Sequence, residues 1–134
     1  MAITEVATGL KFPEGPVVMD DGSVILVEIA AGAITRVLPN GRKQTIAKPG
    51  GGPNGAAIGP DGALYVCKNG GFEYHKVRGV MIPGHQAKDY SGGRIERVDL
   101  STGKVEVLYT HSDGVALRGP NDIVFDRTGG FWFT

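Results

Sequence analysis

The sequence has little of what marks several common protein classes. Among its 134 residues there is one cysteine, Cys67, so no disulfide can form within the chain. The N-terminal stretch MAITEVATGLKFPEG has neither the charged start nor the apolar centre of a secretory signal. Lysine and arginine number 14 against 14 acidic residues, with no basic stripe, which argues against a nucleic-acid or membrane partner. These features favour a cytoplasmic protein.

The motifs of several catalytic mechanisms are also missing. The sequence contains no GxSxG elbow, CxxC pair, Walker loop or GxGxxG before a helix, which argues against serine-nucleophile and nucleotide chemistry. His75, His85 and His111 lack the spacing of zinc ligands. Cys67 lies inside the strand-like run ALYVCK, so we expect a buried structural thiol.

Glycine is abundant, and its distribution indicates the fold. The 22 glycines and 8 prolines fall between short apolar runs and form no linker. This spacing of glycine and proline is typical of many short strands joined by tight turns. The composition is otherwise globular, with 41% hydrophobic and 21% charged residues.

Three stretches of the chain repeat one another. PEGPVVMDDGSVILVE begins at Pro13, PNGAAIGPDGALYVCK at Pro53 and PNDIVFDRTGGFWFT at Pro120. Each runs from a proline and a polar residue through a strand, a glycine-containing turn and a second strand. The first two are followed by matching half-exposed hairpins, GAITRVLPNGRKQTIA and GRIERVDLSTGKVEVLYT.

Four strands in each unit of about forty residues are typical of β-propeller blades. We therefore predict an all-β fold that is part of a β-propeller and a single partial domain over residues 1–134. Blade 1 is expected at about 12–48, blade 2 at about 52–110, and the start of blade 3 at 119–134. A further strand is expected at residues 2–8, which gives eleven strands in all.

Residues 69–92 interrupt blade 2 between its second and third strands. A long loop in a compact fold is often functional, and a lid over a pocket is one interpretation. A surface excursion without function is the other. The sequence favours neither.

The segments FPEGPVV, GPNGAAIGPDGALYV and RGPNDIVFDRTGGFWFT together resemble the SMP-30/gluconolactonase/LRE-like family. The resemblance implies a six-bladed propeller that binds a divalent metal in its central channel and hydrolyses lactones. What the chain matches is the N-terminal half of a family member. The resemblance runs along nearly the whole chain.

Polar residues occupy matching positions of the three repeats: Glu14, Asn54 and Asn121. The first strand of each propeller blade lines the channel, so these side chains should converge near one mouth. Such an oxygen-rich cluster suits a hard cation such as Ca²⁺ or Mg²⁺, with Zn²⁺ a further possibility. The alternatives are structural roles: Glu14 would cap a turn, and both asparagines would form hydrogen bonds with the neighbouring backbone.

The resemblance assigns roles to these residues. It implies that Glu14 is a metal ligand and that Asn121 lies beside the metal, contacts substrate and takes part in catalysis. Arg118 is expected to contact a substrate oxygen. Asn54 is a candidate substrate-binding residue by its repeat position, without a firm family role. Asp122 is expected to satisfy backbone donors.

The sequence thus predicts a metal-dependent hydrolase of lactones or related esters, with Ca²⁺ the favoured cofactor. The alternative is a non-catalytic propeller fragment that acts as a binding or scaffold module. In the family, the remaining metal ligands come from later blades. We therefore expect a complementary chain, or a second copy of this one, to complete the ring, unless the chain is a truncated product. The apolar strand that ends at Thr134 is expected to be an edge that further blades cover.

Overall fold

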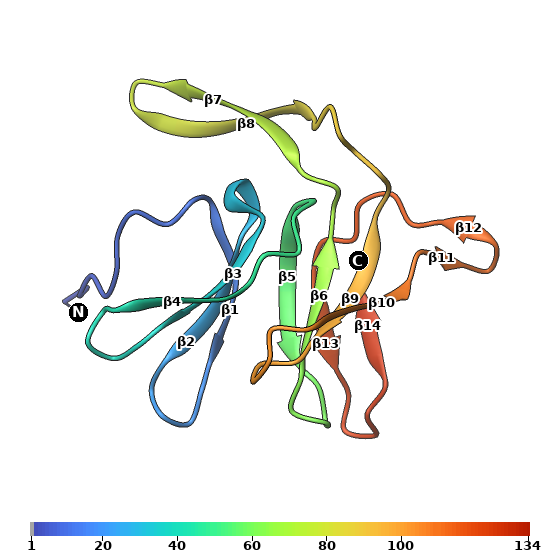
Figure 1. Cartoon of the computed structure of the whole chain (residues 1–134), viewed down its shortest axis with the longest axis horizontal. Helices are drawn as coiled ribbons and strands as arrows, with labels where there is room; N and C mark the ends of the chain where they lie inside the picture. The colour runs from blue at the N-terminus through green and yellow to red at the C-terminus, as the bar shows by residue number, and fades with distance from the viewer. Residues whose placement is uncertain (1) are drawn as a thin grey trace.

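The computed structural model describes residues 2–134, and their regular structure is almost entirely β (Figure 1). The elements are β1 (Pro13–Val18), β2 (Val24–Glu28), the short 3-10 helix η1 (Ile29–Ala31), β3 (Ala33–Val37), β4 (Lys43–Ala47), β5 (Pro53–Ile58), β6 (Leu64–Lys68), β7 (Phe72–Val77), β8 (Val80–Gln86), β9 (Arg94–Val98), β10 (Val105–Tyr109), β11 (His111–Ser112), β12 (Val115–Ala116), β13 (Ile123–Phe125) and β14 (Phe131–Phe133). No helix in this part of the chain is long and apolar enough to cross a membrane.

The strands form two four-stranded antiparallel sheets and the start of another. The first sheet has the order β1-β2-β3-β4, and the second has the corresponding order β5-β6-β9-β10. The pair β13-β14 begins the third unit. Within residues 2–134 no sheet closes on itself. The repeat seen in the sequence is therefore a repeat of meandering antiparallel sheets.

The sheets lie side by side through their first strands. β1 contacts β5, and β5 contacts β13 (Figure 1). The core between the two complete sheets is formed by side chains from both, including Ile25, Val27, Leu64 and Val66, which are fully buried. These residues come from the second strands β2 and β6, which are apolar on both faces because they are covered on both sides. The outer strands β4 and β10 are mostly exposed.

Glycine at one repeat position permits the sheets to approach. A Cβ on Gly15, where φ is +52°, would come within 2.7 Å of the Ala56 amide nitrogen on the next sheet. A Cβ on Gly55 would overlap the Asn121 carbonyl, which accepts a hydrogen bond of 2.6 Å from the Gly55 amide. Only a residue without a side chain fits there. The third repeat has Asp122 at this position.

A smaller cluster joins the second sheet to the β13-β14 hairpin. It contains Cys67, Ile95 and Ile123, and Cys67 is fully buried. Burial, with a contribution from the nearby Asp122 charge, raises the pKa of the Cys67 thiol to about 12. The thiol therefore stays protonated near neutral pH and serves as packing, as the sequence predicted.

Aspartates hold the tight turns between strands. Asp21 and Asp61 each accept hydrogen bonds in their own turn, from Ser23 and from the Ala63 amide, and each also pairs with an arginine at 2.7 Å. Asp99 accepts bonds from the backbone and hydroxyl of Ser101, at 2.9 and 2.6 Å. From the sequence we expected Asp20 to have this role in the first turn, but Asp21 accepts these bonds.

These bonds make the fold sensitive to acid. Hydrogen bonds from Ser101 and Thr102 hold the pKa of Asp99 well below its usual value of 3.8. Because the folded pKa is depressed, the stabilisation is complete above about pH 5 and is lost as the pH falls through the usual aspartate range towards the folded pKa. We expect the midpoint of thermal unfolding to drop between pH 5 and pH 2, values spanning the usual aspartate range. Asp99→Asn should lower the midpoint at pH 6 and flatten this decline, whereas Asp20→Asn should do neither. Equal pH profiles for all three proteins would contradict this account.

Three expectations about secondary structure differ from the structure. Residues 2–8 form no strand. Residues 69–92 are not an irregular loop, because most of them form the β7-β8 hairpin. A short hairpin, β11-β12, was not expected. The prediction of eleven strands was therefore wrong, although the eight strands of the two full sheets and the two strands of the last repeat are present.

Candidate functional site

Three predicted site residues lie together. Glu14 at the start of β1, Asn54 at the start of β5 and Asn121 just before β13 line one depression of about 290 Å³. They meet because each follows the proline that begins a repeat, and because the first strands of the repeats lie side by side. The lining also contains Gly15 and Gly55. Neither glycine was predicted as part of the site, although both directly follow the polar residue of their repeat.

The polar side chains at the depression have distinct partners. The Asn54 side-chain nitrogen, Nδ2, donates a 2.7 Å hydrogen bond to Oδ1 of Asn121. This bond joins residues from two repeats and leaves the Asn121 amide group free to donate. Glu14 is exposed, and within residues 2–134 no hydrogen bond or ion pair engages its carboxylate. The turn-capping alternative for Glu14 therefore has no contact to support it.

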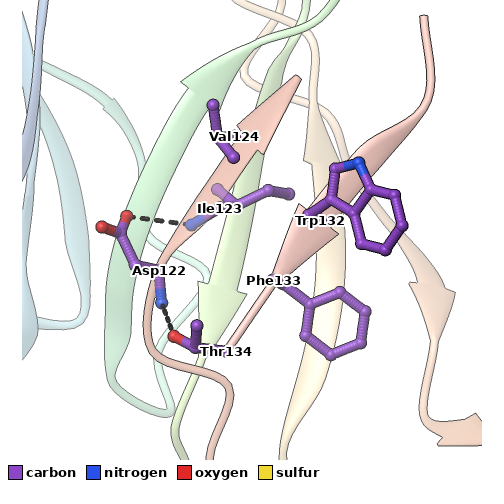
Figure 2. Close-up of a pocket in the computed structure, with 6 residues that line it drawn as sticks. All are labelled: Asp122, Ile123, Val124, Trp132, Phe133 and Thr134. Carbon is purple, nitrogen blue, oxygen red and sulfur yellow. Dashed lines mark hydrogen bonds between the residues drawn. The ribbon is translucent and has the colours of Figure 1, made fainter. Parts of the chain in front are cut away.

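Asp122 has a structural role at the edge of the depression. Its Oδ1 accepts a 2.9 Å hydrogen bond from the Ile123 amide, as expected for a residue that satisfies backbone donors. The Asp122 amide donates to the Thr134 hydroxyl at 3.3 Å (Figure 2). The Thr134 amide donates to the Asp122 carbonyl at 3.1 Å. These bonds hold the ends of the last hairpin together and fix the segment that carries Asn121.

Arg118 lies outside the group. Its side chain is exposed and does not line the depression, and its carbonyl accepts a 2.6 Å hydrogen bond from the Tyr90 hydroxyl. The bond ties the segment before Asn121 to the chain that follows β8. A substrate contact by the Arg118 side chain stays a prediction.

The oxygen-bearing side chains at the depression are of the type that a hard divalent cation prefers, but they are too few to fill its coordination shell. Glu14 offers a carboxylate, and Asn54 and Asn121 offer amide oxygens, the donor types that Ca²⁺ and Mg²⁺ prefer. Residues 2–134 contain no group of three His, Cys, Asp or Glu side chains that could hold a metal. These three side chains fall short of the six to eight oxygen ligands that Ca²⁺ takes, and the Asp122 carboxylate, which also lines the depression, already accepts from the Ile123 amide. Zn²⁺, which prefers nitrogen and sulfur ligands, suits this set less well.

An apolar surface lies on the last hairpin, next to Asp122. A shallow depression of about 160 Å³ is lined by side chains that include Val124, Trp132 and Phe133 (Figure 2). Trp132 is 72% exposed. The corresponding residue of the second sheet, Tyr65, instead packs against Phe125 of the next repeat, with ring centroids 4.9 Å apart. Trp132 therefore sits where the preceding repeat makes its aromatic contact with a neighbour.

Antiparallel sheets that pack through their first strands, with polar residues grouped at the start of those strands, define part of a β-propeller. Residues 12–134 match the model of the SMP-30/gluconolactonase/LRE-like region, and the chain belongs to this family.

Individual relatives show how far the similarity extends. A gluconolactonase of Zymomonas mobilis is 25% identical over 146 residues, which cover 98% of this chain and 35% of that protein. The solved structure of a gluconolactonase from Xanthomonas campestris superposes with a TM-score of 0.69 at 20% identity, over 93% of this chain and 35% of the other. A virginiamycin B lyase of Staphylococcus aureus, solved with quinupristin, gives a TM-score of 0.61 at 22% identity, over 91% and 34%. The chain thus spans about a third of the length of these relatives.

Proposed function

We propose that this chain forms two blades and the start of a third in a six-bladed propeller that hydrolyses lactones or related carboxylic esters with the help of a divalent cation. In this proposal the sheet β1-β4 is blade 1, the sheet β5-β6-β9-β10 is blade 2, and β13-β14 begins blade 3. The observation that carries the proposal is the convergence of Glu14, Asn54 and Asn121 at one depression. The gluconolactonases among the relatives support the type of reaction.

Each residue has a proposed task. Glu14, with its unengaged carboxylate, would hold the cation, for which Ca²⁺ is the first choice. A cation bound there would polarise the substrate carbonyl and lower the pKa of water. Asn121 would donate from its side-chain amide to a substrate oxygen, because the bond from Asn54 falls on the Asn121 oxygen and leaves that amide free. Asn54 would thereby orient Asn121 and form one wall of the site. Arg118 would contact the substrate from outside the depression.

Activity is proposed to require further blades. Three oxygen donors leave the coordination shell of a hard cation unfilled, and the missing ligands and the base would come from the rest of the ring. The exposed face of Val124, Trp132 and Phe133 supports this step, because the preceding repeat buries the corresponding surface. A complementary chain, or a second copy of this one, would supply the blades. We place the assembly in the cytoplasm, which suits the buried Cys67 thiol.

A second function has one observation in its favour. Two carboxylates line the depression, and that of Asp122 accepts a hydrogen bond from the Ile123 amide, which leaves Glu14 as the unengaged one. Without further acidic ligands the same surface could bind small molecules without catalysis, as a propeller used for binding or scaffolding would.

The native particle and its turnover test both functions. We expect a particle heavier than the 14.1 kDa of one chain, which hydrolyses gluconolactone, loses at least about tenfold in rate with EDTA and recovers with Ca²⁺. A 14.1 kDa monomer with full turnover would rule out the need for further blades. Turnover unchanged by EDTA would rule out the metal. A larger particle that binds Ca²⁺ without turnover would favour the binding module.

A further inference from the structure

The last strand, β14, has one free edge. In the part of the chain that the structure describes, β14 pairs with β13 alone, whereas the corresponding strands β2 and β6 each lie between two partners. The second partner is β3 in the first sheet and β9 in the second. An unpaired edge leaves a row of backbone N–H and C=O groups available to another strand. The third unit is therefore incomplete at the position of its third strand.

The two strands that fill this position in the complete sheets share a sequence pattern. β3 contains ITRV at residues 34–37, and β9 contains IERV at residues 95–98. In both strands the isoleucine and the valine are buried and the arginine is half-buried. A third strand of this repeat is thus characterised by the pattern Ile-x-Arg-Val.

The arginine of each third strand binds the aspartate of the first turn in its own sheet. Arg36 donates to Oδ2 of Asp21 at 2.7 Å, and Arg97 donates to Oδ2 of Asp61 at the same distance. The other oxygen, Oδ1, accepts a backbone amide inside the turn in both cases. One carboxylate oxygen therefore holds the turn, and the other holds the third strand through a charge-assisted bond.

The turn of the third unit has the same aspartate but lacks the arginine. Oδ1 of Asp126 accepts bonds from the amide and the hydroxyl of Thr128, at 2.8 and 2.7 Å, and from the Gly130 amide at 3.0 Å. Asp126 is exposed, and no hydrogen bond or ion pair within residues 2–134 engages its Oδ2. The turn thus presents a free carboxylate oxygen at the place where both complete sheets bind an arginine.

The strand register places Trp132 opposite the missing arginine. Arg36 lies opposite Ile25 of β2, and Arg97 lies opposite Tyr65 of β6. Ile25 and Tyr65 are each the second residue of their strand, as Trp132 is in β14. An arginine at the matching position of an added third strand would therefore face Trp132.

Trp132 can form one wall of a site for that arginine. In the second sheet the Tyr65 hydroxyl, at 3.4 Å, and Arg97 both donate to Oδ2 of Asp61, so the aromatic side chain lies beside the ion pair. Trp132 is 72% exposed on the last hairpin (Figure 2). The face of an indole ring attracts a guanidinium group. Asp126 and Trp132 are called the arginine socket below.

A second copy of this chain has no spare strand for the arginine socket. The pattern Ile-x-Arg-Val occurs twice in the sequence, in β3 and β9. β3 lies between β2 and β4, and β9 lies between β6 and β10. A copy that gave up either strand would lose the centre of a complete sheet. The uncommitted Asp126 oxygen therefore favours a strand from a different chain.

We propose that the free edge of β14 is a docking site for an extended Ile-x-Arg-Val segment of a different chain, with its arginine bound in the arginine socket. The segment would add a third antiparallel strand through main-chain hydrogen bonds. Its arginine would donate to Oδ2 of Asp126 and pack on Trp132, and its isoleucine would lie opposite Thr134. This inference rests on the proposed need for further blades, and it selects the complementary chain over a second copy.

Trp132 provides the measurement, because it is the only tryptophan in the chain. The probe is the peptide GAITRVL, residues 32–38, acetylated and amidated at its ends. Tryptophan emission shifts to shorter wavelength when water is excluded, so we expect a saturable blue shift on binding. The same peptide with Arg36→Gln should bind roughly tenfold more weakly, because a hydrogen bond to a charged group is lost.

A protein variant tests whether the peptide arginine binds Asp126. Asp126→Asn should weaken binding of GAITRVL by a similar factor and should weaken the Arg36→Gln peptide no further, because both changes remove the same contact. The matched control is Asp20→Asn, an exposed aspartate of the first turn, which should bind both peptides as the unmodified protein does. The comparison of the two peptides needs no change to the protein, so it decides the matter even if Asp126→Asn unfolds.

The outcomes separate this proposal from the proposed function. Unshifted Trp132 emission, or equal affinity for the two peptides, would overturn the arginine socket even if the completed particle hydrolyses gluconolactone. A blue shift that grows with the concentration of the chain alone would show that a second copy covers the edge, and would overturn the assignment to a different chain. Binding with the expected losses, without lactone hydrolysis by the completed particle, would support the arginine socket and count against the hydrolase.

Discussion

Glu14→Gln is expected to lower kcat/KM for gluconolactone about 10³-fold in the completed protein, a loss of roughly 4 kcal/mol of transition-state stabilisation. The side chain keeps its shape but loses the only full charge among the three polar groups that converge there. A neutral amide holds a divalent cation poorly, so Ca²⁺ affinity measured by calorimetry should fall in parallel. The unfolding midpoint should not change, because Glu14 is exposed and its carboxylate is not engaged within residues 2–134.

The matched control for this variant is Glu106→Gln. Glu106 is an exposed carboxylate on the outer strand β10, far along the sheet from the depression. The Glu106→Gln variant should leave both turnover and Ca²⁺ affinity unchanged. If Glu14→Gln keeps activity within about threefold of the unmodified protein, the residue is not the metal ligand and the proposed mechanism fails, since a lost ligand costs far more.

Lys68→Met is expected to destabilise the fold by about 3–5 kcal/mol. Lys68 ends β6, and its ammonium group lies 3.1 Å from Oε1 of Glu96 on β9, with both side chains less than 5% exposed. The same ammonium donates to the Pro49 carbonyl at 3.0 Å. Methionine fills a similar volume but leaves the Glu96 carboxylate buried without its close partner. The free energy of unfolding in urea measures the loss.

A double variant separates the charge from the packing. Lys68→Met with Glu96→Leu removes both charges, so it should recover most of the stability lost by Lys68→Met alone. The surface control is Arg36→Met, which breaks the 2.7 Å pair with the 54% exposed Asp21 and should cost less than about 1 kcal/mol. A double variant no more stable than Lys68→Met would show that the pair stabilises through shape rather than charge.

The repeat made the arrangement of the site predictable. Matching positions of a repeated unit occupy matching places in space, so Glu14, Asn54 and Asn121 could be grouped from the amino-acid sequence alone. The alternation of buried inner strands and exposed outer strands followed from hydrophobic pattern alone. Their roles in metal and substrate binding stay predictions, because the positions of the side chains do not show what they bind.

The errors share a physical cause, which is that strands depend on partners. Residues 2–8 have a strand-like composition, but no strand within residues 2–134 pairs with them, so they stay irregular. Residues 72–86 contain Gly79 with φ of +83° between two strand-forming runs, a turn that was overlooked inside a segment treated as one loop. The contact between Phe12 and Tyr74 was missed because the two residues are far apart in sequence and no repeat relates them.

The placement of the hairpin has a consequence for the order in which the chain can assemble. Only residues 29–32 connect β2 to its partner β3, whereas residues 69–93 connect β6 to its partner β9. Both pairs nevertheless have an unbroken register of five residues. Closing the longer loop costs about 1.5 kcal/mol more in chain entropy. The β7-β8 hairpin shortens that loop when it forms, because its turn is local and its ends lie together. Formation of the hairpin thus brings β9 close enough to pair with β6.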